Sequence, residues 1–156
     1  MALAQMERGD EFVSLRCQIA RLYEQAIENC TWLTAQKTPP GYRNSYWTYG
    51  LLLNSEKSGI SWSEFRNVFL ELGGEPFYAA WLPNYREPAF SDFIPQSNPY
   101  ENGCCPVAEK IHPNLLQLKT NFGSLDEGKE QAKILKRTIQ VLETKSVPVK
   151  RQSVFS

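Results

Sequence analysis

One short apolar run limits the fold of this chain more than any other feature. Residues 46–53, YWTYGLLL, are aromatic or aliphatic almost throughout, and turn residues bound the run. Its length and these flanks favour a strand over a helix. Residues 77–81, FYAAW, and residues 115–118, LLQL, are interpreted in the same way. Strands this short need helices to cover their apolar side.

Three stretches with helical periodicity can supply that cover. The first runs from Asp10 to Asn29, and its apolar positions, three and four residues apart, are Phe12, Leu15, Ile19, Leu22 and Ala26. Ser61–Glu64 and Ser124–Glu127 each match a capping box, in which serine and glutamate satisfy opposite ends of the first turn. The sequence therefore predicts an α+β fold, with about three strands in a small sheet and helices packed mainly on one face.

Residues 1–143 are predicted to form a single domain, and residues 144–156 a frayed tail. A chain of 156 residues is long enough for one domain with a substantial core. Residues 82–106 are a long irregular stretch with five prolines, whose aromatic content indicates an ordered, packed loop. Pro106 is expected to open a short helix, which Pro113 closes after His112.

Composition and charge argue against several classes of protein. Seventeen basic and seventeen acidic residues cancel, so nothing points to nucleic acid or an anionic membrane as a partner. No apolar run is long enough to span a bilayer, and the charged N-terminus lacks the core of a signal peptide. We therefore expect a cytoplasmic protein.

The residues that usually carry catalysis are too few here for a complete site. His112 is the only histidine, and a solvated or capping role fits it better than that of a base. Cys17, Cys30, Cys104 and Cys105 form no C-x-x-C pair, so no metal site is predicted. The vicinal pair can be redox-active or bind soft metals, but buried or half-buried packing thiols are the favoured interpretation.

Four other residues are considered as binding groups. Lys119 follows an apolar strand and can hold a phosphate or carboxylate in a cleft, although a lysine extending to water is the commoner outcome. Trp47, Trp81 and Tyr85 can stack on a ring or sugar. A core position is favoured for Trp47, and the two roles are balanced for Trp81 and Tyr85.

Four segments together resemble a known family. These are LRCQIARLYEQAIE, NSYWTYGLLL, ISWSEFRNVFLELGGEPFYAAW and CPVAEKIHPNLLQLKTNF. In order and spacing they resemble the C-terminal part of the DegT/DnrJ/EryC1/StrS aminotransferases, and the resemblance extends from Ala2 to Glu143. Those enzymes use pyridoxal phosphate, have the aspartate-aminotransferase fold, and in many cases act on nucleotide-linked keto-sugars.

The resemblance implies a small antiparallel sheet, like that of the small domain of fold-type-I aminotransferases. It also implies that residues 82–106 lie towards the active-site mouth. Tyr46, Trp81, Tyr85 and Lys119 are then the residues expected to face substrate. The family's usual Pro-Leu-His element appears here as Pro83, Asn84 and Tyr85, without the histidine, which is closer to a divergent branch of the family.

The resemblance also implies what this chain lacks. The Schiff-base lysine, the aspartate that pairs with the pyridine nitrogen and the phosphate-binding residues all belong to a large domain that would precede Met1. No cofactor-binding or catalytic residue is therefore expected here, and the chain alone is predicted to be no competent transaminase. Expected partners are a second copy, a separate large-domain subunit or a nucleotide-sugar substrate. Two alternatives are a free-standing module that binds sugar nucleotides and a domain that dimerises.

Overall fold

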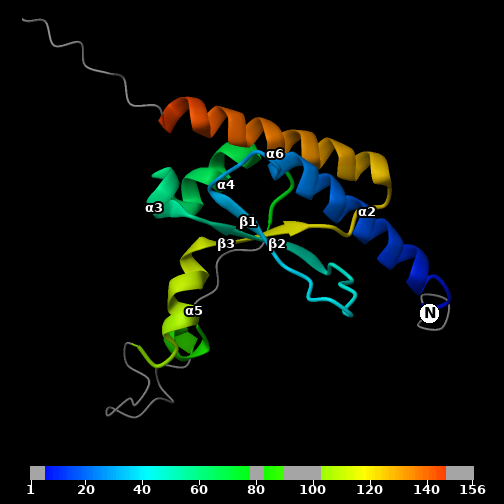
Figure 1. Cartoon of the computed structure of the whole chain (residues 1–156), viewed down its shortest axis with the longest axis horizontal. Coiled ribbons are helices and arrows are strands. Elements are labelled where there is room, and N and C mark those ends of the chain that lie inside the picture. The colour runs from blue at the N-terminus through cyan, green and yellow to red at the C-terminus, as the bar shows by residue number, and fades with distance from the viewer. Residues whose placement is uncertain (1–5, 78–82, 90–102, 147–156) are drawn as a thin grey trace, which may run out of the picture.

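The computed structural model describes residues 6–77, 83–89 and 103–146 (Figure 1). In chain order the elements are α2 (Gly9–Ile27), β1 (Leu33–Ala35), β2 (Thr48–Leu53), α3 (Ser55–Ser58), α4 (Trp62–Glu71), the 3-10 turn η1 (Asn84–Arg86), α5 (Pro106–Ile111), the 3-10 turn η3 (His112–Asn114), β3 (Leu115–Lys119) and α6 (Leu125–Ser146). No helix within these ranges is long and apolar enough to cross a membrane.

The sheet has three antiparallel strands in the order β1-β2-β3, as predicted. In its register Leu33 lies opposite Leu53, and Leu51 lies opposite Leu116. One strand of the sheet, β1, differs from the prediction. β1 was not anticipated, because three residues are too few to show an alternating pattern. Of the predicted strand at 77–81, only Phe77 lies among the described residues, and it is buried outside any strand.

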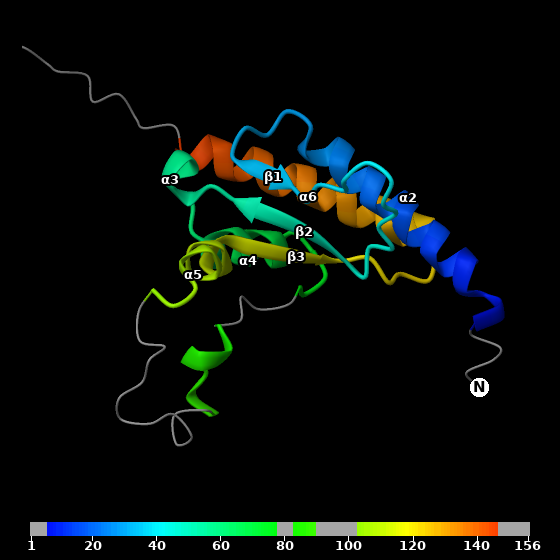
Figure 2. The same cartoon turned by 60° about the horizontal axis from the view of Figure 1, so that its bottom comes forward.

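Helices cover one face of the sheet, which confirms the predicted arrangement. Along β2, Tyr49, Leu51 and Leu53 are fully buried, and Leu116 and Leu118 of β3 join them on the same face. These side chains form one core with the buried residues of α2, α4 and α6. Figure 1 shows these three helices above the sheet and α5 on its other side, and Figure 2 gives a tilted view.

The buried stripe of α2 is rotated from the predicted one. Ile19, Tyr23 and Ile27 are buried, whereas Phe12 is 39% exposed, so the prediction for Phe12 was wrong. The spacing of apolar residues identifies the apolar side of a helix, but it does not show which of these residues other elements cover. Figure 1 shows the N-terminal end of α2 extending past the sheet.

Both predicted capping serines do cap helices. The Ser61 hydroxyl accepts the Glu64 amide at 3.2 Å. The Ser124 hydroxyl accepts the Glu127 amide at 3.3 Å and donates to the Glu127 carboxylate at 3.0 Å. Gly73 and Gly74 end α4, and Gly73 adopts a φ of 91°.

Three further boundaries sharpen the predictions. Pro106 opens α5 and His112 follows it, as expected. The single-turn helix α3 follows β2, and the Asn54 side chain caps it by accepting the Lys57 amide at 2.9 Å. Helix α6 continues to Ser146, three residues past the predicted end at Glu143.

Candidate functional site

Two of the predicted substrate-facing residues, Tyr46 and Lys119, meet at one end of the sheet. Lys119 is the last residue of β3 and pairs with Thr48, the first residue of β2. The hydroxyl of Thr120 donates to the Tyr46 carbonyl at 2.6 Å and to the Trp47 carbonyl at 3.1 Å. Thr120 itself is fully buried. This threonine therefore joins the start of β2 to the end of β3.

The backbone of Tyr46 is held in an unusual conformation. Its φ is 49°, and it is the only non-glycine residue with a positive φ in the described part of the chain. Such a conformation costs of order 1 kcal/mol or more for a residue with a Cβ, and it persists where surrounding contacts fix it. Here the Asn44 side chain accepts the Tyr46 amide at 2.8 Å, and Thr120 holds the carbonyl. The ring packs 6.0 Å from that of Tyr49.

The ammonium group of Lys119 already has two neighbours. It lies 3.2 Å from the Glu75 carboxylate and 5.0 Å from the centre of the Phe122 ring. The backbone carbonyl of Lys119 accepts the Tyr23 hydroxyl at 2.9 Å. An anion that bound Lys119 would compete with Glu75, and a pair this exposed is worth at most about 1 kcal/mol. The lysine is therefore positioned by its neighbours but still available.

Tyr85 lies away from this pair. Its hydroxyl donates to the Glu109 carboxylate of α5 at 2.6 Å, and Arg86 pairs with the same carboxylate at 3.0 Å. The hydrogen bond to Glu109 raises the pKa of Tyr85 to about 12 and lowers that of Glu109. Helix α5 leads through η3 into the start of β3, whereas Lys119 ends that strand. Trp81, the fourth predicted residue, lies outside the described residues.

Two other expectations about side-chain environment were wrong. Trp47 is 63% exposed, although a core position was favoured. It stands just before β2, so the core no longer surrounds it. Cys104 and Cys105 are free and exposed, whereas buried or half-buried thiols were favoured. They precede α5 at the surface, while Cys17 and Cys30 are half-buried as expected.

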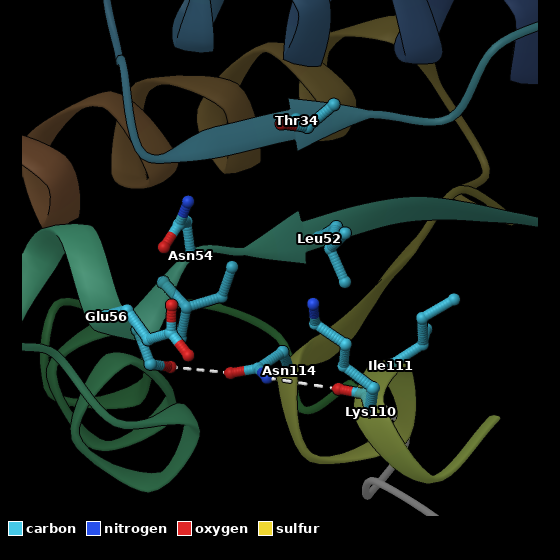
Figure 3. Close-up of a pocket in the computed structure, with 9 residues that line it drawn as sticks. Thr34, Leu52, Asn54, Glu56, Lys110, Ile111 and Asn114 are labelled. Carbon is cyan, nitrogen blue, oxygen red and sulfur yellow. Dashed lines mark hydrogen bonds between the residues drawn. The ribbon is translucent and has the colours of Figure 1, made fainter. Parts of the chain in front are cut away.

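A pocket of about 260 Å³ lies near the far end of the sheet (Figure 3). Its residues include Leu52 of β2, Glu56 of α3 and Lys110 of α5. Figure 3 shows the Lys110 side chain pointing from α5 towards Leu52. Asn114 joins the two helices, because its side chain accepts the Ser55 hydroxyl at 2.6 Å and donates to the Lys110 carbonyl at 3.3 Å.

Sequence reasoning missed the residues that organise both places. Thr120 and Glu109 each make several contacts that fix a loop, yet neither stands in a motif. The one local signal is that Glu109 lies in the first turn of a helix opened by proline, where a carboxylate is favoured. Thr120 has no comparable signal, because its partners are more than 70 residues away in the chain.

The described residues do not fit the cofactor implied by the family resemblance. Pyridoxal phosphate is held through a lysine in an enclosed site, where burial tunes the amine. Every described lysine is exposed except Lys119, which is half-buried and paired with Glu75. The described residues also contain no group of three or more side chains able to hold a metal ion. That the chain binds no cofactor by itself stays a prediction.

Similarity to solved structures supports the fold. An aminotransferase TlmJ from Streptoalloteichus hindustanus superimposes with a TM-score of 0.70 at 19% identity, over 89% of this chain and 35% of that one. DesI, solved in the presence of its TDP-sugar product, superimposes with a TM-score of 0.70 at 15% identity, over 94% of this chain and 36% of that one. 3-Amino-5-hydroxybenzoic acid synthase superimposes with a TM-score of 0.65 at 21% identity, over 88% of this chain and 37% of that one. The chain thus spans little more than a third of each of these structures.

Sequence comparison supplies the family. No curated protein matches the chain significantly. The model of the DegT/DnrJ/EryC1/StrS aminotransferase family, however, matches residues 1–135 of the 156. That match includes the three strands, the helices α2 and α4, and the first half of α6. The chain therefore belongs to the DegT/DnrJ/EryC1/StrS aminotransferase family.

Proposed function

We propose that this chain is the small, C-terminal domain of a cytoplasmic, pyridoxal-phosphate-dependent aminotransferase that acts on nucleotide-linked keto-sugars. One observation carries the proposal: the family model matches residues 1–135, while the chain spans only 35–37% of the similar aminotransferase structures. DesI, one of those structures, was solved with a TDP-sugar product, which supports the substrate class. On this proposal the chain is inactive without a large domain that carries the cofactor lysine.

In such an enzyme this domain would help to close the site over the sugar nucleotide. The sheet end at Tyr46 and Lys119 supports this role, because backbone contacts fix both residues where β2 begins and β3 ends. Lys119 would offer a positive charge to an anionic part of the substrate. Tyr46 would offer an aromatic ring and a hydroxyl. Tyr85 and Trp81, which lie between α4 and α5 in the sequence, remain candidates.

The first experiment tests whether the isolated chain forms a Schiff base with pyridoxal phosphate, which borohydride would trap. The purified chain is incubated with pyridoxal phosphate, treated with borohydride and mapped by mass spectrometry. We expect only sparse, unselective labelling of exposed lysines, and no transamination of a nucleotide-linked keto-sugar with glutamate. One stoichiometric adduct at a single lysine would contradict the claim that the described lysines form no cofactor site.

A second experiment combines the chain with a large domain and tests whether the pair is active. The DNA adjacent to the Met1 codon is read for a large-domain coding region, and the two polypeptides are produced together and assayed. We expect the mixture to transaminate a nucleotide-linked keto-sugar. Lys119→Met should raise the KM for that sugar several-fold, while Lys136→Met, at an exposed position of α6, serves as the matched control. Failure of the mixture to form an internal aldimine would overturn the proposal.

A dimerisation module is the second candidate, and one observation favours it. Two large side chains remain uncovered beside the sheet: Trp47 is 63% exposed and Leu52 is 37% exposed. Exposed large apolar side chains mark an interface where they gather into a patch. Sedimentation velocity at increasing concentration distinguishes the candidates. A chain that is monomeric throughout, and that associates only with a large-domain partner, removes this alternative.

A further inference from the structure

A second pocket, of about 400 Å³, lies between α2 and the segment that leads into β2. Helix α2 contributes Arg21 and Glu24 to its wall. The segment before β2 contributes Tyr42, Arg43 and Tyr46. The wall is therefore rich in guanidinium groups and hydroxyls, which are the groups that bind oxyanions in proteins.

The two guanidinium groups have no partner in the part of the chain that the structure describes. Among the described residues, neither Arg21 nor Arg43 makes an ion pair or a side-chain hydrogen bond. Glu24 is the only acidic residue in the pocket wall and has no partner there either. Two positive charges and one negative charge leave a net positive charge, with five donor hydrogens on each guanidinium.

A buried hydroxyl next to this pocket also lacks a partner. Tyr49 is fully buried, and its hydroxyl is the one buried side-chain polar atom in the described residues without a hydrogen bond. The ring of Tyr49 packs 6.0 Å from that of Tyr46, which lines the pocket. A buried donor without an acceptor is costly, and an oxyanion, directly or through a water molecule, would supply the acceptor.

The strained residue Tyr46 belongs to the same pocket. Its positive φ, fixed by Asn44 and Thr120, sets the direction of its side chain at the pocket wall. Backbone strain of this kind concentrates at ligand sites, since the surrounding contacts must hold it in place. The two arginines and the strained residue Tyr46 thus lie in the wall of one pocket, and Tyr46 also packs against Tyr49.

We propose that this pocket binds the phosphate group of a small phosphate ester. A phosphate dianion can engage both guanidinium groups and a hydroxyl at once, and its second charge outweighs the repulsion by Glu24. A carboxylate has one charge and two oxygens, and so fits the same wall less well. The inference does not rest on the proposed aminotransferase function, because it concerns only residues of this chain.

Calorimetric titration of the full chain with inorganic phosphate tests the site. We expect saturable, one-to-one binding that weakens as salt is added, and weaker binding of acetate. Arg43→Gln and Arg21→Gln should each weaken phosphate binding by about tenfold, as expected for loss of a charged hydrogen-bond partner. Arg137→Gln, an exposed arginine of α6, is the matched control and should change nothing. Circular dichroism verifies that each variant is folded.

Glu24 gives a test of opposite sign. Glu24→Gln removes the one carboxylate of the wall, so it should tighten phosphate binding several-fold while Arg43→Gln loosens it. Unchanged affinity in both arginine variants, or acetate bound as tightly as phosphate, would overturn the proposal. A parallel titration with thymidine diphosphate identifies the source: tighter binding than inorganic phosphate points to a nucleotide, and equal binding to a free phosphate group. Neither result depends on transamination.

Discussion

The rings of Tyr23 and Tyr49 pack together in the core, with centroids 5.4 Å apart and ring planes inclined by 37°. Both side chains are almost completely buried, yet only one hydroxyl has a partner. The Tyr23 hydroxyl donates to the Lys119 carbonyl at 2.9 Å, whereas the Tyr49 hydroxyl has no partner among the described residues. Two neighbouring tyrosines therefore differ in whether the hydroxyl has a partner among the described residues, which makes them a useful pair for comparison.

Replacing each tyrosine by phenylalanine should have opposite effects on stability. Tyr23→Phe removes a hydrogen bond and leaves a carbonyl unpaired, so it should lower the free energy of unfolding by about 1–2 kcal/mol. Tyr49→Phe removes a buried polar atom with no partner, so stability should stay the same or rise by up to about 1 kcal/mol. Urea unfolding in phosphate-free buffer measures both changes. A Tyr49→Phe variant as unstable as Tyr23→Phe would show that this hydroxyl has a bound partner in solution.

The contact between α2 and α6 depends on the absence of a side chain at Gly128. A Cβ placed there would lie 2.6 Å from Cγ1 of Ile19, which is fully buried. Gly128→Ala should therefore destabilise the protein by about 1–2 kcal/mol, since overpacking costs more than the roughly 1 kcal/mol that alanine gains in a helix. Gly9→Ala is the control, because a Cβ there meets nothing within 4 Å. It should leave the unfolding midpoint unchanged or slightly raised, and equal midpoints for the two variants would disprove the packing argument.

The fold was predictable where local pattern and final environment agree. The strands β2 and β3 are apolar runs whose alternate residues face the helices, so each run carries its own signal. Ser61 and Ser124 cap helices through contacts three residues away, which a sequence motif records directly. β1 was missed because Leu33–Ala35 becomes a strand only by pairing with residues 51–53. Its conformation is decided by a partner, and no local pattern contains that information.

The candidate site was predictable only in part, for the same reason. Tyr46 and Lys119 were named from residue type and strand position, but their proximity follows from the register of β2 and β3. Tyr85 was named with them, yet its contacts are with Glu109 of α5. The unpaired state of Arg43 had no sequence signal at all, because it depends on which carboxylates the fold brings near.

Thr120 should be the main link between the start of β2 and the end of β3. Thr120→Val keeps the shape of the side chain but leaves the carbonyls of Tyr46 and Trp47 without their donor. We expect it to lower the free energy of unfolding by about 1–3 kcal/mol and to weaken phosphate binding, because Tyr46 loses its support. Thr120→Ser retains the hydroxyl and loses one methyl group, so it should cost only about 1 kcal/mol, from the lost transfer free energy and a small cavity. Equal losses in the two variants would show that the hydroxyl contributes nothing.

The bond between Tyr85 and Glu109 should give stability a defined dependence on pH. The hydrogen bond from Tyr85 lowers the pKa of Glu109 below its ordinary 4.5, so this contribution is present above pH 4.5 and is lost as the carboxylate is protonated at lower pH. The same bond raises the pKa of Tyr85 from 10 to about 12, so the contribution is lost again as pH rises from 10 towards 12. Thermal unfolding of the wild type and of Tyr85→Phe across this range measures it. The wild type should unfold at the higher temperature between pH 4.5 and 10, and the difference should shrink on both sides. A difference that persists unchanged at pH 3 would mean that Tyr85 stabilises α5 by packing and not through the Glu109 carboxylate.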